Sequence, residues 1–137
     1  MANASDYLES QVGTHLLRTG SWTKPSAIYV ALYTVMPAEA GTGGTEVTGG
    51  SYARVEHGPS DATWSAPVSG NGQFSNIGTV QFPAPTANWG EVVGFGLLDA
   101  STGGNYLIGN TFATPITINS GDPVPAFATG GLVVTVA

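Results

Sequence analysis

The second half of the sequence consists of short apolar runs separated by turn-forming residues. Segments rich in Gly, Pro, Asn and Ser divide these runs at short intervals. Strands this short, at this spacing, are typical of an antiparallel β-sandwich or barrel. The sequence therefore predicts a mainly β fold, an antiparallel β-sandwich or barrel-like domain of short strands, with candidate strands at residues 74–76, 79–82, 91–99, 105–112, 115–118, 124–127 and 132–136.

Two patterns predict how the strands pack. Residues 27–34 are β-branched, aromatic and almost continuously apolar, which favours a central strand buried on both faces. In residues 93–97, glycines alternate with large apolar residues, so one face carries the bulk and the other admits a close neighbour. Residues 51–56 are a further short strand candidate.

Residues 5–18 predict one N-terminal amphipathic helix. Leu8, Val12 and Leu16 recur at helical spacing on one face. Asp6 and Glu9 have the spacing of a capping box, and Gly20 is the expected C′ residue. A glycine inside the helix, Gly13, costs about 1 kcal/mol relative to alanine. The helix therefore needs a surface to pack on.

A Gly-rich segment, residues 36–50, follows the central strand. Its glycine content predicts a long loop without a regular element, and loops of this length usually make contacts or carry function. We expect it to be a contact arm within a single β-rich domain spanning residues 1–137. Residues 57–72 show no regular pattern.

Charge is sparse and mostly acidic. The chain has three basic and nine acidic residues, for a formal net charge of −6. So few cations argue against a nucleic-acid partner, and no apolar stretch approaches the roughly 18 residues of a membrane span. A surface with few charges loses its water at low cost, which favours repeated packing against other protein subunits.

The sequence shows no convincing catalytic or metal-binding pattern. His57 lies near Ser60, Asp61 and Ser65, but no Gly-x-Ser-x-Gly elbow surrounds a serine. Cysteine is absent, and His15 and His57 are too few for a zinc site. Nothing selects a glycosidase pair among the scattered acids, Glu39, Glu46, Glu56, Asp61 and Glu91. We therefore expect no enzyme activity and no cofactor.

Two features leave alternatives open. Asp99 and Asn105 flank a Gly-rich turn, where they could bind calcium or, as the plainer alternative, cap the turn. The tryptophans could be buried plugs or could stack on sugar rings at an exposed site: Trp22, Trp64 and Trp89.

Taken together, segments along almost the whole chain resemble a family of small virion proteins of tailed bacteriophages, of the tail-fibre-like or head-decoration (cement) type. The segments that carry the resemblance are residues 5–9, 25–34, 40–47, 49–54, 82–83, 86–90, 95–100 and 103–104. Residues 57–72, with additional prolines and Trp64, depart from the family pattern.

The resemblance implies a non-enzymatic structural protein of the virion, made in the host cytoplasm. As a cement protein on the outer capsid surface, it would bind and stabilise the major capsid protein and associate with its own copies, a trimer being favoured over a dimer. The alternative is a tail-fibre or baseplate-associated module that binds a host-surface glycan.

Within this interpretation, the helix, the Gly-rich arm and their neighbours supply the expected interface. Arg and Tyr are favoured at interface hot spots, although Arg54 could equally be a solvent residue at a strand end. The candidate interface residues are Leu8, Gly43, Gly44, Glu46, Tyr52, Arg54 and Trp64.

Overall fold

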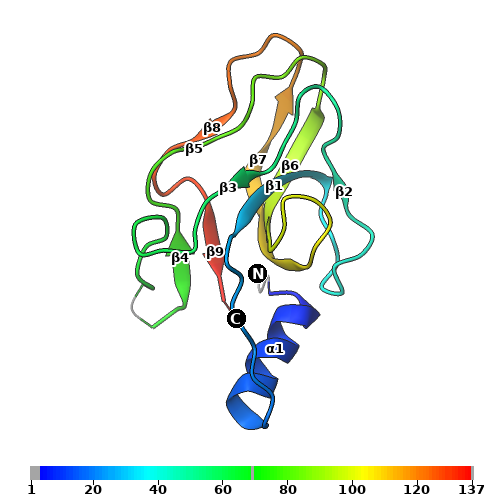
Figure 1. Ribbon diagram of the computed structural model, residues 1–137. Helices are drawn as coiled ribbons and strands as arrows, with labels where there is room; N and C mark the ends of the chain where they lie inside the picture. Colours follow the sequence, from blue (N-terminus) through cyan, green and yellow to red (C-terminus); the bar gives the residue numbers. More distant parts are fainter. Residues whose placement is uncertain (1–3, 69, 137) are drawn as a thin grey trace.

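The computed structural model describes residues 4–68 and 70–136 as antiparallel β-structure with one N-terminal helix (Figure 1). The mainly β prediction is confirmed. The elements, in chain order, are α1 (Asp6–Leu17), β1 (Tyr29–Val35), β2 (Thr45–Glu46), β3 (Val55–Glu56), β4 (Gln73–Ser75), β5 (Val80–Gln81), β6 (Gly90–Leu98), β7 (Tyr106–Ile118), β8 (Ala126–Phe127) and β9 (Val133–Thr135).

A five-stranded sheet organises the molecule, in the order β2-β1-β6-β7 with β3 also paired to β1. The β4–β9 and β5–β8 pairs are separate two-stranded sheets whose apolar side chains join the same core as those of β1, β6 and β7. This arrangement is sandwich-like. The described strands do not close into a barrel, because the large sheet ends at β2 on one side and at β7 on the other.

β1 is the central strand that its apolar run predicts. Val30 and Leu32 point into the main core, whereas Ala31 and Tyr33 belong to a smaller cluster on the opposite face. All four residues are buried, so neither face of β1 meets water along this stretch. The continuous apolar run reflects burial on both sides.

The glycines of β6 allow aromatic rings to lie against the strand. A Cβ atom built on Gly96 would come within 2.6 Å of Tyr106 and 2.9 Å of Tyr33. A Cβ on Gly94 would meet the sulfur of Met36 at 2.7 Å. Tyr33 and Tyr106 also contact each other edge to face, with their ring centroids 6.0 Å apart. The predicted close approach on one face of β6 is confirmed.

Replacing Gly96 with alanine is therefore expected to lower the free energy of unfolding by about 1–3 kcal/mol, because the new methyl group overlaps two packed rings. Chemical denaturation measures the change. Gly13→Ala is the matched control: its Cβ would meet nothing within 4 Å in the same chain, so alanine should not destabilise the fold of a single chain. Equal effects of the two substitutions would contradict the packing described for β6.

β7 is one strand where the sequence predicts two. It runs from Tyr106 to Ile118, but its register against β6 shifts, since Thr111 opposes Gly94 while Ile116 opposes Val92. The extra residues of β7 form a bulge that contains Pro115. Proline cannot donate to a ladder and is tolerated at bulges, which explains why a proline does not end the strand.

α1 matches its predicted position but not its predicted caps. Ser5, not Asp6, is the N-cap: its hydroxyl accepts a hydrogen bond from the Leu8 N–H at 3.2 Å. At the other end, Arg18 is the C-cap in an extended conformation, so Gly20 does not occupy the C′ position.

The packing of α1 is also more limited than its apolar face predicts. No residue within α1 is fully buried; Tyr7 and Leu8, near its start, pack against the core. Beyond them the helix projects away from the sheets (Figure 1). Leu16 remains 75 % exposed and Leu17 80 % exposed. Within the described residues, the chain therefore supplies a packing surface for the start of α1 and leaves its far half uncovered.

The Gly-rich arm contains a short regular element that the sequence does not predict. Thr45 and Glu46 form β2, which pairs with β1 opposite Val35 and Tyr33. The expectation of an entirely irregular loop over residues 36–50 is wrong at this point. The pairing matters because it fixes the position of Glu46 beside the large sheet.

Candidate functional site

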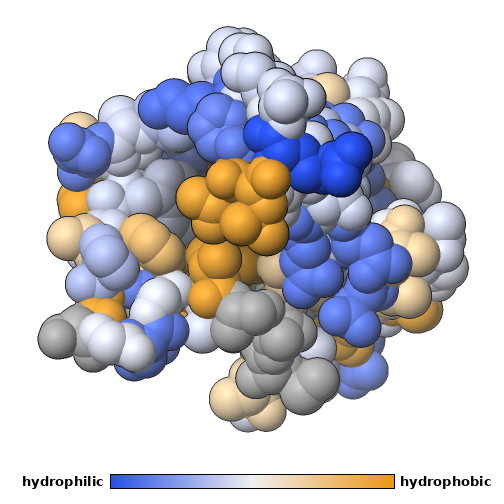
Figure 2. Space-filling model, turned by 90° about the horizontal axis from the view of Figure 1, so that it is seen from below, coloured by the Kyte–Doolittle hydropathy of each residue, from blue (hydrophilic) through white to orange (hydrophobic). Residues whose placement is uncertain are grey.

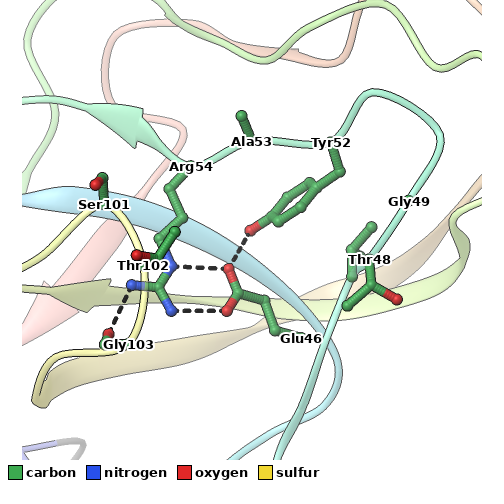
Figure 3. A pocket seen from close by; sticks show the side chains of 10 residues that line it. Glu46, Thr48, Gly49, Tyr52, Ala53, Arg54, Ser101, Thr102 and Gly103 are labelled. Carbon is green, nitrogen blue, oxygen red and sulfur yellow. Dashed lines mark hydrogen bonds and ion pairs between the residues drawn. The ribbon is translucent and has the colours of Figure 1, made fainter.

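An open groove of about 480 Å³ lies between the arm and the tip of the β6–β7 hairpin (Figure 3). Arg54 and Glu46 form part of its wall, with Tyr52 beside them. The remaining lining residues are mostly small, and three of them carry a hydroxyl group: Val47, Thr48, Gly49, Ala53, Ser101, Thr102 and Gly103. The structure thus brings together three of the predicted interface residues and adds hairpin-tip residues that the sequence did not single out.

Arg54 holds the arm and the hairpin tip together. Its Nε and Nη2 donate to the two carboxylate oxygens of Glu46, at 2.9 and 2.8 Å. Its Nη1 donates to the carbonyls of Ala100 and Gly103, at 2.7 and 2.8 Å. The Arg54 side chain is only 8 % exposed. Most of its donors are therefore occupied by partners within the chain.

Glu46 receives a third hydrogen bond, from the Tyr52 hydroxyl at 2.7 Å. Burial of the carboxylate opposes its ionisation, but the hydrogen bonds from Arg54 and Tyr52 and the charge of Arg54 outweigh it and lower the pKa of Glu46. The Tyr52 hydroxyl also accepts from the Leu32 N–H at 3.0 Å. Burial and the bond to Glu46 raise the pKa of Tyr52, so this hydroxyl stays protonated. The cluster joins the arm to β1.

A second hollow, of about 260 Å³, opens on the other side of the Arg54–Glu46 pair. Gly43 and Gly44 line it, together with Tyr33 and Tyr106. Burial raises the pKa of both tyrosines to about 12. A Cβ on Gly44 would come within 2.7 Å of Pro37, so this glycine is needed for the arm to fold back on itself.

Leu8 and Trp64 lie apart from this cluster. Leu8 is half-buried at the base of α1. Trp64 is half-buried against the core; its indole N–H donates to the His57 carbonyl at 2.8 Å, and the two rings contact edge to face. Trp89 is 5 % exposed and Trp22 is half-buried. Trp89 is therefore a buried plug, whereas Trp22 and Trp64 are only partly buried.

The residues considered for catalysis engage other partners. His57 Nε2 lies 3.1 Å from the Thr63 carbonyl and 3.0 Å from that of Ile77. Since carbonyls only accept, this nitrogen carries a proton and donates it. Ser60 bonds to the Thr63 hydroxyl, and Ser65 accepts from the Ser75 N–H.

Asp99 caps the β6–β7 turn. Its carboxylate accepts from the N–H of Asn105 at 2.7 Å and from the Asn105 side-chain amide at 2.9 Å. These bonds match the plainer of the two sequence interpretations. Within residues 4–68 and 70–136, no group of three or more His, Asp or Glu side chains could hold a metal ion. Nor does any helix in this part of the chain have the length and apolar character to cross a membrane.

The sequence matches the family described as Podophage GP4 fiber I protein gp80 over residues 3–135. The chain belongs to this family. No curated protein matches it. Membership confirms the resemblance to small virion proteins of tailed phages, and specifically to the tail-fibre-like type. It makes the chain a structural component of the virion.

For a member of the phage-fibre family, the two notable surfaces are the groove around Arg54 and the exposed part of α1. Sequence reasoning found Glu46, Tyr52 and Arg54 but missed the hairpin tip, residues 101–103, because it lies far along the chain. It also found the apolar stripe of α1, and the structure shows that the far part of this stripe is exposed. Figure 2 views the molecule from the end toward which α1 projects and shows a hydrophobic cluster beside strongly hydrophilic residues.

Proposed function

We propose that this chain is a non-enzymatic fibre subunit of a podophage particle and that the projecting part of α1 is its assembly element. Membership of a phage-fibre family supports the fibre position. The observation that carries the proposal is the exposure of Leu16 and Leu17 on a helix that leaves the body of the molecule. Large exposed apolar side chains grouped in this way are typical of protein interaction sites.

The remainder of the molecule suits a passive structural role. The chain carries few charges, so its exterior is mostly neutral and polar. The internal bonds of Arg54 and Glu46 stiffen the arm against the hairpin tip. The two candidate catalytic serines have hydrogen-bond partners other than His57. These features favour shape and rigidity over chemistry.

A cement protein on the outer capsid surface is the second candidate. The sparse charge favours it, because a neutral surface packs against a capsid lattice with little loss of hydration. In that case the major capsid protein would be the main partner. A protein that binds only the assembled shell stabilises the shell by its free energy of binding. Binding of a host-surface glycan through Trp64 belongs to the fibre candidate.

Electron microscopy of purified particles labelled with an antibody against this chain tests the proposal. We expect label at the tail. Label spread over the capsid would instead favour the cement function, and particles lacking this protein should then break more readily on heating or at low salt. Purified particles without the chain would overturn both candidates.

A further inference from the structure

We propose that α1 docks onto α1 of a second copy of this chain, antiparallel, so that the apolar tip of each helix fills a groove at the base of the other. The proposal rests on the proposed function for the use of α1 in assembly, and it names the partner. The occupant follows from properties of the helix itself: its two ends are complementary in shape and in charge.

The receiving groove lies at the base of α1. It has a volume of about 270 Å³ and is lined mainly by apolar groups from the N-terminal segment, the helix and the end of the chain: Ala4, Leu8, Val12, Gly13 and Val136, with Glu9 among them. A Cβ on Gly13 would meet nothing within 4 Å. Packing within one chain therefore does not require a glycine inside this helix. A second helix crossing here would benefit from it, because a missing side chain lets two backbones approach.

The inserting tip is one to two turns farther along the same helix. Leu16 and Leu17 are 75 % and 80 % exposed, and Val12, between tip and groove, is 46 % exposed. At 1.5 Å per residue, the tip lies about 9 Å beyond the middle of the groove. Two antiparallel helices that cross near Gly13 would therefore place each tip beside the other's groove. The same patch serves both subunits, as a two-fold interface requires.

Charge favours the antiparallel orientation. The acidic residues Asp6 and Glu9 lie in the first turn, near the groove, and His15 and Arg18 lie at the tip, followed by Lys24. Arg54, the third base of the chain, is bonded to Glu46. Arg18, which directly follows Leu17, thus places a basic side chain next to the exposed leucines.

In an antiparallel pair, the basic tip of each helix lies beside the acidic first turn of the other. The two helix dipoles are then antiparallel, which is also favourable. A parallel arrangement would place acid beside acid and base beside base. Two bodies of net charge −6 repel overall, so a contact between their oppositely charged ends is the favourable one.

Measuring the mass of the purified chain in solution, by light scattering after size exclusion, tests the proposal. We expect twice the mass of one chain. Leu16→Gln should weaken association at least about 100-fold, since two buried leucines are lost per dimer. The helix should persist, because this side chain is largely exposed and glutamine is a good helix former. Val124→Gln, at a residue 40 % exposed in the loop before β8, is the control and should leave the mass unchanged.

Cysteine pairs test the orientation, and the absence of native cysteine makes them unambiguous. We expect chains carrying Glu9→Cys to form a disulfide with chains carrying Leu16→Cys when the two are mixed and oxidised. Neither should cross-link to itself, because identical positions would lie about 10 Å apart along the axis, beyond the reach of a disulfide. Cross-linking of Leu16→Cys to itself would show a parallel bundle and overturn the proposal.

A monomer at all concentrations would overturn it as well. These outcomes are read on the isolated protein, whereas the proposed function is read on the particle. A monomeric chain that is found in the tail would leave the fibre function standing and remove only the self-docking of α1.

Discussion

Replacing Glu46 with alanine is expected to destabilise the protein by about 3 kcal/mol, because it leaves the guanidinium of Arg54 without its counter-charge. The Arg54 side chain is 8 % exposed and that of Glu46 22 % exposed, so the pair is largely shielded from water. Removal of one partner from such a pair typically costs about 3–5 kcal/mol. The partial exposure of Glu46 places the expected value at the lower end.

Chemical denaturation of the Glu46→Ala chain measures this loss, with Glu91→Ala as the control. Glu91 is an exposed carboxylate on β6, and its removal should change the free energy of unfolding by no more than about 0.5 kcal/mol. If the two substitutions had the same effect, the Arg54–Glu46 pair would not hold the arm to the hairpin.

The same pair predicts a pH dependence. The pKa of Glu46 is lowered in the folded protein from its ordinary value of 4.5, so the unfolded chain binds this proton more readily. The stability due to the pair is therefore fully present above pH 4.5 and is lost as pH falls through the lower pKa of the folded state. The Glu46→Ala chain should lack this part of the acid sensitivity.

The sequence selected those groove residues that lie close together in the chain. Glu46, Tyr52 and Arg54 lie within nine residues and were selected together. The carbonyls that Arg54 binds belong to Ala100 and Gly103, 46 and 49 residues away. No local pattern identifies a distant carbonyl as a partner, so the sequence left open whether Arg54 faces solvent or another group.

Strand prediction shows a similar division. Apolar runs located β1 and β6, because burial on both faces leaves a pattern that needs no knowledge of the neighbours. The sequence predicted two strands in place of β7 because proline normally ends a strand. Only the pairing with β6 reveals the bulge that accommodates Pro115. β2 was missed because its two residues are held by pairing with β1 and not by their own propensity.

α1 illustrates what an apolar stripe can and cannot predict. The spacing of Leu8, Val12 and Leu16 correctly predicts a helix with one apolar face. It does not reveal whether the covering surface belongs to the same chain. The structure covers Leu8 and leaves Leu16 exposed, so the stripe crosses from the core of the molecule to its surface.

Replacing Trp89 with alanine is expected to have the largest effect among the tryptophans, a loss of about 3–5 kcal/mol. Trp89 is 5 % exposed and contacts Tyr52 edge to face, with ring centroids 5.3 Å apart. Its indole N–H donates to the Gly50 carbonyl at 2.9 Å. A Cβ on Gly50 would lie 2.8 Å from that nitrogen, so the turn of the arm is built against the indole. Loss of the ring creates a cavity and loosens the arm.

Two control variants separate these contributions. Trp89→Phe keeps most of the buried area but loses the hydrogen bond to Gly50, and should cost less than Trp89→Ala by at least about 1 kcal/mol. Trp22→Ala removes a half-buried ring near α1 and should cost less than Trp89→Ala. A Trp89→Ala chain no less stable than Trp22→Ala would mean that the arm does not depend on the indole. Glu46, Tyr52 and Arg54 would then need another support to keep their positions.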